Sequence, residues 1–261
     1  MYIMYADEAD QDGSKEYLIY ASVFFPSDQI LKIHNGMIGI RNKFGFAPGD
    51  KFKFSPGGIS KSISREAHAA AKNEALKLAA KHQYKACCYI TPHSIAKGQT
   101  HENRLKFGIN TLLMKFDQFL RENGNAPGVA KFDRTSDFKQ EQYFKEIFEN
   151  GILFQKDNKS FKLNNIVSID NTLNGTSHLS SLTDIVVGSF RFVINEPNKD
   201  LVGAKLLKSL SNLLWGVKDK NGVLLVRERG FCIRPKNVAV AGYNADINAL
   251  ISRLNAYAKQ T

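Results

Sequence analysis

A run of acidic side chains follows the first apolar segment of the chain. Residues 5–13 read YADEADQDG, which places four carboxylates within six positions, beginning with Asp7 and Glu8. Open α/β sheets usually carry their chemistry where buried strands end. Carboxylate oxygens gathered at such a place are ligands that Mg²⁺ accepts. The stretch therefore predicts a metal site at Asp7, whereas Asp10 and Asp12 are typical of a solvated turn.

Three more acidic residues occupy comparable places farther along the chain. Asp133 ends a short apolar run at 129–132, and Asp170 ends another at 161–169. Asp184 lies inside a segment that is apolar almost all round, where an unpaired charge is costly. Carboxylates that are packed together raise one another's pKa unless a cation lies between them. We therefore expect these residues to converge with Asp7 on Mg²⁺ or Mn²⁺.

Each of these residues also has a purely structural interpretation. Asp133 terminates a strand whatever its chemistry, and Asp170 precedes Asn171 in a dipeptide typical of turns. Asp184 can form an ion pair with Arg191 on the same segment or with another basic group. The shared placement of the acidic residues favours the metal site over three unrelated explanations.

The periodicity of the sequence predicts an α/β fold that positions these acids. Strands are expected at 1–6, 17–25, 51–54, 84–91, 129–132, 153–155 and 161–169, the last two as a pair. Helices are expected at 29–43, 65–82, 98–123, 138–150, 177–195, 201–217 and 243–258. Residues 1–199 form the expected core, and residues 200–261 form a basic extension that packs on it within a single domain.

The charge is distributed unevenly along the chain. The net charge of +11 divides into −3 over residues 1–50, +7 over 51–100, 0 over 101–200 and +7 over 201–261. Basic zones of this kind favour a polyanionic partner, because Lys and Arg that neutralise phosphates release counterions. No apolar run reaches the roughly 18–20 residues of a membrane span. The three cysteines are spaced poorly for disulfides, and we expect a cytoplasmic protein.

Basic and aromatic residues alternate near the end of the chain. Arg227 and Arg229 precede Phe231, and Arg234 follows it. Side chains of these two kinds suit a nucleic-acid backbone and its bases. An ordinary surface hairpin explains the pattern equally well, so both interpretations stay open.

Four segments carry a resemblance to a known family. They are YADEADQDG at the start, KFKFS around Lys53, VAKFD ending at Asp133, and SIDN followed by SHLSSLTDIVVGSF. In this order they resemble the bacterial and phage family catalogued as domain of unknown function 3800, over about residues 1–195. The resemblance implies a ribonuclease H-like fold, with a mixed five-stranded sheet flanked by helices and its first three strands antiparallel. The C-terminal helix and hairpin lie outside it.

The resemblance also implies a set of functional residues. Asp7, Asp133 and Asp184 occupy the family's acidic positions on strand one, strand four and the last core helix. Asp170 falls at the Asp of the family's Asp-Ser pair, and Lys53 at its Lys. A Lys at that place could orient a water molecule in catalysis or bind a phosphate of the nucleic acid, although a solvated strand residue is the structural alternative. Glu8 is a secondary catalytic candidate.

The chain departs from the family pattern at several positions. Ala9 and Asp10 replace a Ser and a Gly, and Lys51 stands where an acidic residue is often found. Ribonuclease H-like enzymes usually have a further Glu ligand from the first helix. The sequence does not choose among Glu8, Glu66 and Glu74 for that place.

The leading functional hypothesis is a Mg²⁺- or Mn²⁺-dependent nuclease that hydrolyses phosphodiester bonds of DNA or RNA, in a role such as defence against phages or mobile elements. The alternative is a non-catalytic nucleic-acid-binding or interaction module on the same fold. A phosphatase with Asp7 as nucleophile is disfavoured, because Ala9 stands where such sites carry a second Asp.

Overall fold

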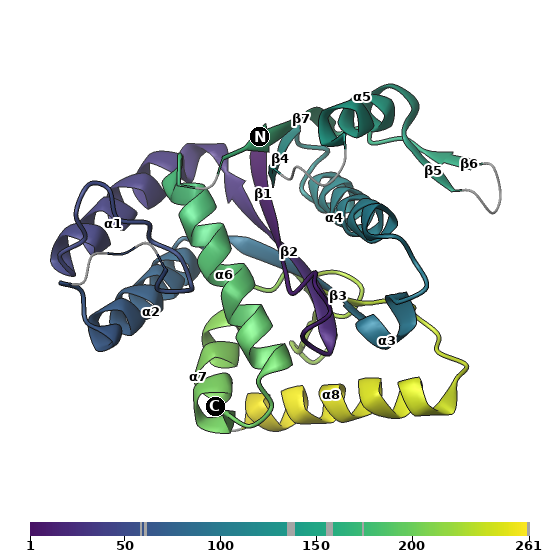
Figure 1. Cartoon of the computed structure of the whole chain (residues 1–261). Coiled ribbons are helices and arrows are strands. Elements are labelled where there is room, and N and C mark those ends of the chain that lie inside the picture. Colours follow the sequence, from purple (N-terminus) through teal and green to yellow (C-terminus); the bar gives the residue numbers. More distant parts are fainter. Residues whose placement is uncertain (58, 60–61, 135–138, 155–158, 174, 260–261) are drawn as a thin grey trace.

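The structure is a computed structural model that describes residues 1–57, 59, 62–134, 139–154, 159–173 and 175–259. Figure 1 shows a twisted central sheet with helices on both of its faces. The sheet contains β1 (Tyr2–Ala9), β2 (Tyr17–Pro26), β3 (Lys85–Pro92), β4 (Gly128–Asp133), β7 (Ile166–Thr172) and β10 (Phe231–Ile233). Two small hairpins pair β5 (Ile152–Phe154) with β6 (Lys159–Phe161) and β8 (Val217–Lys218) with β9 (Leu224–Leu225). The longer helices are α1 (Ile30–Lys43), α2 (Arg65–Lys81), α4 (His101–Glu122), α5 (Gln140–Asn150), α6 (His178–Asn195), α7 (Asp200–Ser211) and α8 (Ala241–Lys259), with short turns η1 (Ser27–Gln29) and α3 (His93–Ala96).

The strand order is β10-β3-β2-β1-β4-β7. Strands β1, β2 and β3 are antiparallel in succession, whereas β4 is parallel to β1 and β7 is parallel to β4. These directions confirm the expected ribonuclease H-like α/β fold. The expected strand number was wrong, because β10 from the C-terminal region pairs in parallel with β3 and adds a sixth strand. Its three residues carry no strong strand pattern of their own, so only the tertiary pairing identifies them.

The sheet separates two apolar cores. Strand β2 is buried along Tyr17–Phe25, and alternate side chains enter opposite cores. One core contains side chains of α1, α2, α6 and α7, and the other contains side chains of α4 and α5. Tyr5 of β1 belongs to the first core and Ala6 to the second. Because successive side chains of a strand point to opposite faces, Asp7 of β1 faces the side covered by α6, and Glu8 faces the side covered by α4.

Helix α6 crosses the sheet beside β1 and β2 (Figure 1). It begins after Ser177, whose hydroxyl oxygen accepts a hydrogen bond from the Leu179 amide at 3.1 Å, as an N-cap residue does. Most of its side chains are buried, which explains the apolar sequence. The helix holds Asp184 at the end of the sheet where β1 and β4 finish.

Three expected elements are corrected by the structure. Residues 51–54 form no strand, and their backbone is held by side chains instead. Phe161–Ile169 does not pair with 153–155, because β6 takes that place and β7 joins the central sheet; residue 155 lies outside the described residues. The helix expected at 201–217 ends at Ser211, so Trp215 lies after it. The proposed cap Asp137 also lies outside the described residues.

Residues of the C-terminal region contact the core at several places. Helix α7 packs against α6, and α8 packs against α7. Trp215 is buried against Phe24 and Phe119. Among the described residues, the structure contains no helix with the length and apolar character that a membrane crossing needs.

Candidate metal centre

Asp7 and Asp133 lie side by side on neighbouring parallel strands. Ala6 of β1 is opposite Phe132 of β4, and the two aspartates are the next residue of each strand. Because Tyr5 faces the core covered by α6, Asp7 points the same way, and Asp133 alternates with the buried Phe132 of the other core. A small recess at this place is lined by both aspartates together with residues of β7 and α6, namely Thr172, Ser180 and Thr183.

Asp184 comes to these two residues from α6. Its side chain is 17% exposed. The Oδ2 atom accepts a hydrogen bond from the main-chain N–H of Phe54 at 2.7 Å, and Oδ1 lies 3.9 Å from the ammonium of Lys53. The suggested ion pair between Asp184 and Arg191 does not form, because Arg191 donates to Asp10 at 2.7 Å.

The pKa of Asp7 reflects its proximity to Asp133 and Asp184. Burial and repulsion by Asp133 and Asp184 raise the pKa of Asp7 to about 7, against an ordinary value of 3.8. A hydrogen bond from the Glu8 amide at 2.8 Å and the charge of Lys53 oppose this rise. The carboxyl group of Asp7 thus lies where a negative charge is poorly stabilised without a neighbouring cation.

The donor set of this cluster fits a hard divalent cation. All of its ligand atoms are carboxylate oxygens, which Mg²⁺ and Mn²⁺ prefer, and a cation would relieve the repulsion that raises the pKa of Asp7. Within the described ranges, no three acidic, histidine or cysteine side chains are arranged as a complete metal site. Asp184 has other partners, since Oδ2 accepts a hydrogen bond from the Phe54 amide and Oδ1 lies 3.9 Å from the Lys53 ammonium.

Asp170 lies apart from the other three acids. It sits inside β7, opposite Lys131, two residues before the Thr172 that neighbours Asp133. Two residues of strand correspond to about 6.6 Å. The carboxylate of Asp170 accepts a hydrogen bond from Ser168 at 2.8 Å and lies 3.7 Å from the Lys131 ammonium. The structure therefore does not bring Asp170 to the cluster, and the expectation that a strand ends at this residue was wrong.

The candidates for a further Glu ligand are also placed elsewhere. Glu8 points to the opposite face of β1 from Asp7 and lines a recess with Tyr20 and Gln140. Glu66 is exposed in the first turn of α2, where Ser64 is the N-cap. Glu74 forms an ion pair with Lys43. None of the three is among the charges that act on Asp7.

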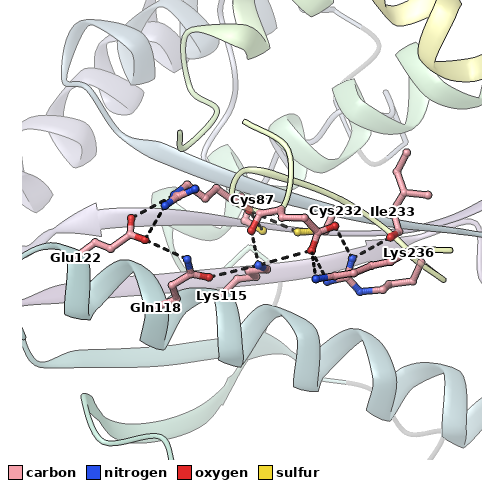
Figure 2. A network of polar contacts seen from close by, with 10 residues as sticks. Cys87, Lys115, Gln118, Glu122, Cys232, Ile233 and Lys236 are labelled. Atoms are coloured by element: carbon pink, nitrogen blue, oxygen red, sulfur yellow. Dashed lines mark hydrogen bonds and ion pairs between the residues drawn. The ribbon is translucent and has the colours of Figure 1, made fainter. Parts of the chain in front are cut away.

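The arginines of the C-terminal region lie at the other edge of the sheet, around β10. Arg234 donates two hydrogen bonds to Glu228, at 2.8 and 3.0 Å, and Arg229 forms an ion pair with Glu122 at 3.3 Å. Figure 2 shows this network, in which Lys115 reaches Glu228 and the thiol of Cys232 lies nearby. Arg227 is exposed. Two of the three arginines predicted to bind nucleic acid are thus engaged by acidic partners of the chain itself.

Sequence reasoning missed two residues that organise the cluster from α2. His68 donates from Nε2 to the carbonyl oxygen of Lys53 at 2.9 Å, and Lys72 donates to the carbonyl oxygen of Phe54 at 3.0 Å. The available signal was their spacing of four residues, which puts both on one face of an otherwise Ala-rich helix. That signal does not reveal which loop the face contacts.

Comparisons with known proteins give distant similarities only. No family model matches the sequence, and no curated protein matches it. A chain in the structure of the PCNA:RNase HII complex from Archaeoglobus fulgidus is 14% identical with a TM-score of 0.45, and the match covers 84% of this chain and 98% of that one. Bst-RNase HIII in complex with Mn²⁺ is 12% identical with a TM-score of 0.38, and the match covers 82% of this chain and 64% of that one. These similarities assign no activity to this chain, whose fold class follows from its own strand order.

Proposed function

We propose that this protein is a divalent-metal-dependent nuclease. One observation carries the proposal: three acids from β1, β4 and α6 meet at the carboxyl ends of the strands, where burial and mutual repulsion raise the pKa of Asp7 to about 7. Asp7, Asp133 and Asp184 form the acidic centre, and Mg²⁺ or Mn²⁺ is the cofactor. This centre does not include Asp170, Glu8, Arg229 or Arg234, because these residues lie elsewhere in the structure.

The residues of the centre have distinct roles in phosphodiester hydrolysis. A bound divalent cation supplies an activated water molecule and charge stabilisation. Asp7 and Asp133 would hold it, since their side chains project from adjacent strands toward the same recess. Lys53 brings a fixed positive charge beside the acids, which suits a substrate phosphate. No side chain of the chain needs to act as a covalent nucleophile.

Nucleic acid, DNA or RNA, is the proposed substrate. Residues 51–100 carry a net charge of +7, and this zone includes Lys53 and Lys72 at the centre itself. A phosphate backbone that crosses the centre would meet these charges together with the metal. Membership of the domain of unknown function 3800 family stays a prediction, because no family model matches the sequence. The three cysteines are free and buried, which supports a proposed cytoplasmic location.

A cleavage assay tests the proposal. The purified chain is incubated with single- and double-stranded DNA, RNA and a hybrid duplex, with Mn²⁺, with Mg²⁺ and with EDTA. We expect metal-dependent cleavage of at least one substrate, and a loss of more than about 100-fold in Asp7→Asn, beyond the 10–100-fold typical of losing a group that supports a metal ligand. A folded wild type that cuts none of these substrates contradicts the proposal.

The engagement of Asp184 favours one alternative, a non-catalytic nucleic-acid-binding module. In that case Asp184 would be a structural acceptor for Phe54 and Lys53 and nothing more. Such a module would bind oligonucleotides with a steep salt dependence. Its melting temperature would not rise on addition of Mn²⁺, whereas a metal-binding centre is stabilised by its ligand.

A further inference from the structure

The segment Lys51–Phe54 is held rigidly over the acidic centre although it is not a strand. Two consecutive carbonyl oxygens, of Lys53 and Phe54, accept hydrogen bonds from His68 and Lys72 of α2. The intervening N–H of Phe54 donates to Asp184 of α6. The backbone on both sides of the Lys53–Phe54 peptide bond is thus fixed by two different helices.

The ring of Phe54 is fixed as firmly as its backbone. The Lys72 ammonium lies 4.1 Å from the ring centroid, within the range of a cation–π contact. On the other side the ring packs on Gly188 of α6, where an added Cβ would come within 2.2 Å of Phe54. Glycine at this position is therefore required for the ring to lie against the helix. Helices α2 and α6 together form a clamp, defined here as His68, Lys72 and Gly188.

The clamp holds the main chain from which the Lys53 side chain extends. With its main chain fixed, Lys53 places its ammonium 3.9 Å from Oδ1 of Asp184, and its side chain is 28% exposed. Oδ2 of Asp184 accepts a hydrogen bond from the Phe54 amide. One oxygen of this carboxylate therefore faces a main-chain donor, and the other faces the Lys53 ammonium.

We propose that the centre binds one divalent cation, held by Asp7 and Asp133, and that the Lys53 ammonium supplies the second positive charge. Asp184 is then a positioning residue for Lys53 rather than a bridge between two metal ions. The inference rests on the proposed function and specifies its metal content.

Charge balance supports this assignment. Three carboxylates carry a charge of −3, which one divalent ion and one ammonium neutralise. A second divalent ion about 3.5–4 Å from the first would bring the positive charge of two ions and one ammonium to +5 against the −3 of the three carboxylates. Among the described residues, Asp170, Glu66 and Glu74 are engaged with other partners, and Glu8 faces the opposite side of β1.

Metal stoichiometry tests the inference without reference to activity. Mn²⁺ is titrated into the metal-free full chain by calorimetry, and the bound ion is examined by electron paramagnetic resonance. We expect one Mn²⁺ per chain with the spectrum of an isolated ion. Two ions per chain, or the spectrum of a coupled pair, overturn the inference while the proposed function stands. The absence of Mn²⁺ binding overturns both.

Lys53→Met provides a second readout that a merely structural lysine would not produce. Removing a positive charge beside the metal position should tighten Mn²⁺ binding about three- to tenfold, as expected for a unit charge several ångströms from the ion. Nuclease activity should fall at the same time. Lys51→Met, two residues earlier and exposed, should change the Mn²⁺ dissociation constant less than twofold. Weaker Mn²⁺ binding in Lys53→Met, or activity equal to wild type, overturns the inference, and the wild-type stoichiometry decides it if this variant does not fold.

Discussion

The main-chain N–H of Phe54 donates a 2.7 Å hydrogen bond to Oδ2 of Asp184, which joins residues 130 positions apart in the chain. This bond connects the loop that carries Lys53 to the helix that covers the acidic centre. A carboxylate that accepts a main-chain amide has a defined orientation, because the donor cannot move without its backbone. The geometry of the centre therefore depends on a loop that carries no regular secondary structure.

Gly188→Ala tests the close approach of Phe54 to α6. The new Cβ would come within 2.2 Å of the Phe54 ring, so the ring and its amide must move. We expect the free energy of unfolding to fall by about 1–3 kcal/mol, as in other overpacked cores, and nuclease activity to fall with it. Urea denaturation followed by circular dichroism measures the change.

Gly39→Ala is the matched control on α1. It is another glycine inside a helix, and an added Cβ there meets nothing within 4 Å. This substitution should raise the free energy of unfolding by about 0.5–1 kcal/mol, because alanine has the higher helix propensity. Equal effects of the two substitutions would contradict a specific contact between Gly188 and Phe54.

Lys72→Met tests the clamp itself. Methionine keeps much of the apolar stem but removes the ammonium that binds the Phe54 carbonyl oxygen and ring. We expect kcat to fall about 10–100-fold, a loss similar to that of a group that supports a metal ligand, because the loop that carries Lys53 loses one of its contacts, with KM changed less than twofold. Lys72→Arg should restore part of kcat because it keeps the charge and the donor.

The control for this experiment is Lys77→Met, an exposed lysine of the same helix. Its kcat should stay within twofold of wild type. If Lys72→Met and Lys77→Met reduce kcat equally, the effect arises from the net charge of the helix and the positioning role is wrong.

The stability of the metal-free protein should depend on pH through Asp7. Its folded-state pKa of about 7 exceeds the unfolded value of 3.8, so between these values the folded form keeps a proton that the unfolded form releases. The contribution of this group to stability is complete below about pH 4 and is lost as pH rises through 7. Asp7→Asn removes this dependence, so the variant should gain up to about 4 kcal/mol relative to wild type between pH 4 and pH 8.

Urea titrations at several pH values in EDTA measure this difference. Adding Mn²⁺ at pH 8 should stabilise the wild type and leave Asp7→Asn much less affected, because the ion binds the ionised carboxylate. Parallel pH profiles for the two proteins would show that the pKa of Asp7 is ordinary.

The arginines around β10 should separate into structural and exposed groups. Arg234→Gln breaks two hydrogen bonds to Glu228 and should lower the free energy of unfolding by about 1–2 kcal/mol, with little change in nucleic-acid affinity. Arg227→Gln changes an exposed side chain and should leave stability within about 0.5 kcal/mol. If Arg227 contacts phosphate, its loss should also reduce the slope of log affinity against log salt by about 1.

Fluorescence anisotropy of a labelled oligonucleotide at several salt concentrations provides that slope. A larger loss of affinity in Arg234→Gln than in Arg227→Gln, with both variants folded, would restore Arg234 as a nucleic-acid ligand despite its ion pair.

Much of this molecule follows from local sequence pattern. Strands and helices impose periods of 2 and 3.6 on buried side chains. The sequence therefore indicates the apolar runs before Asp7 and Asp133 and the Ser-capped apolar helix that contains Asp184. The alternation of side chains along β1 places Asp7 and Glu8 on opposite faces of the sheet before any long-range contact is known. The α/β class of the fold was therefore predictable, whereas the local pattern grouped Asp170 with Asp7, Asp133 and Asp184 and only the family resemblance separated it from them.

Register and partner choice were decided only by the tertiary structure. Asp170 resembles the other acids in sequence, yet its position inside β7 leaves it beside Lys131, one step away from Asp133 along the sheet. Residues 51–54 alternate like a strand, but hydrogen bonds from α2 and α6 hold them as a loop. These pairings join residues that are 15 to 130 positions apart, and no local period encodes them. The sequence by itself determined that acids lie at or near strand ends, whereas packing between distant elements decided which of them meet and which charge faces them.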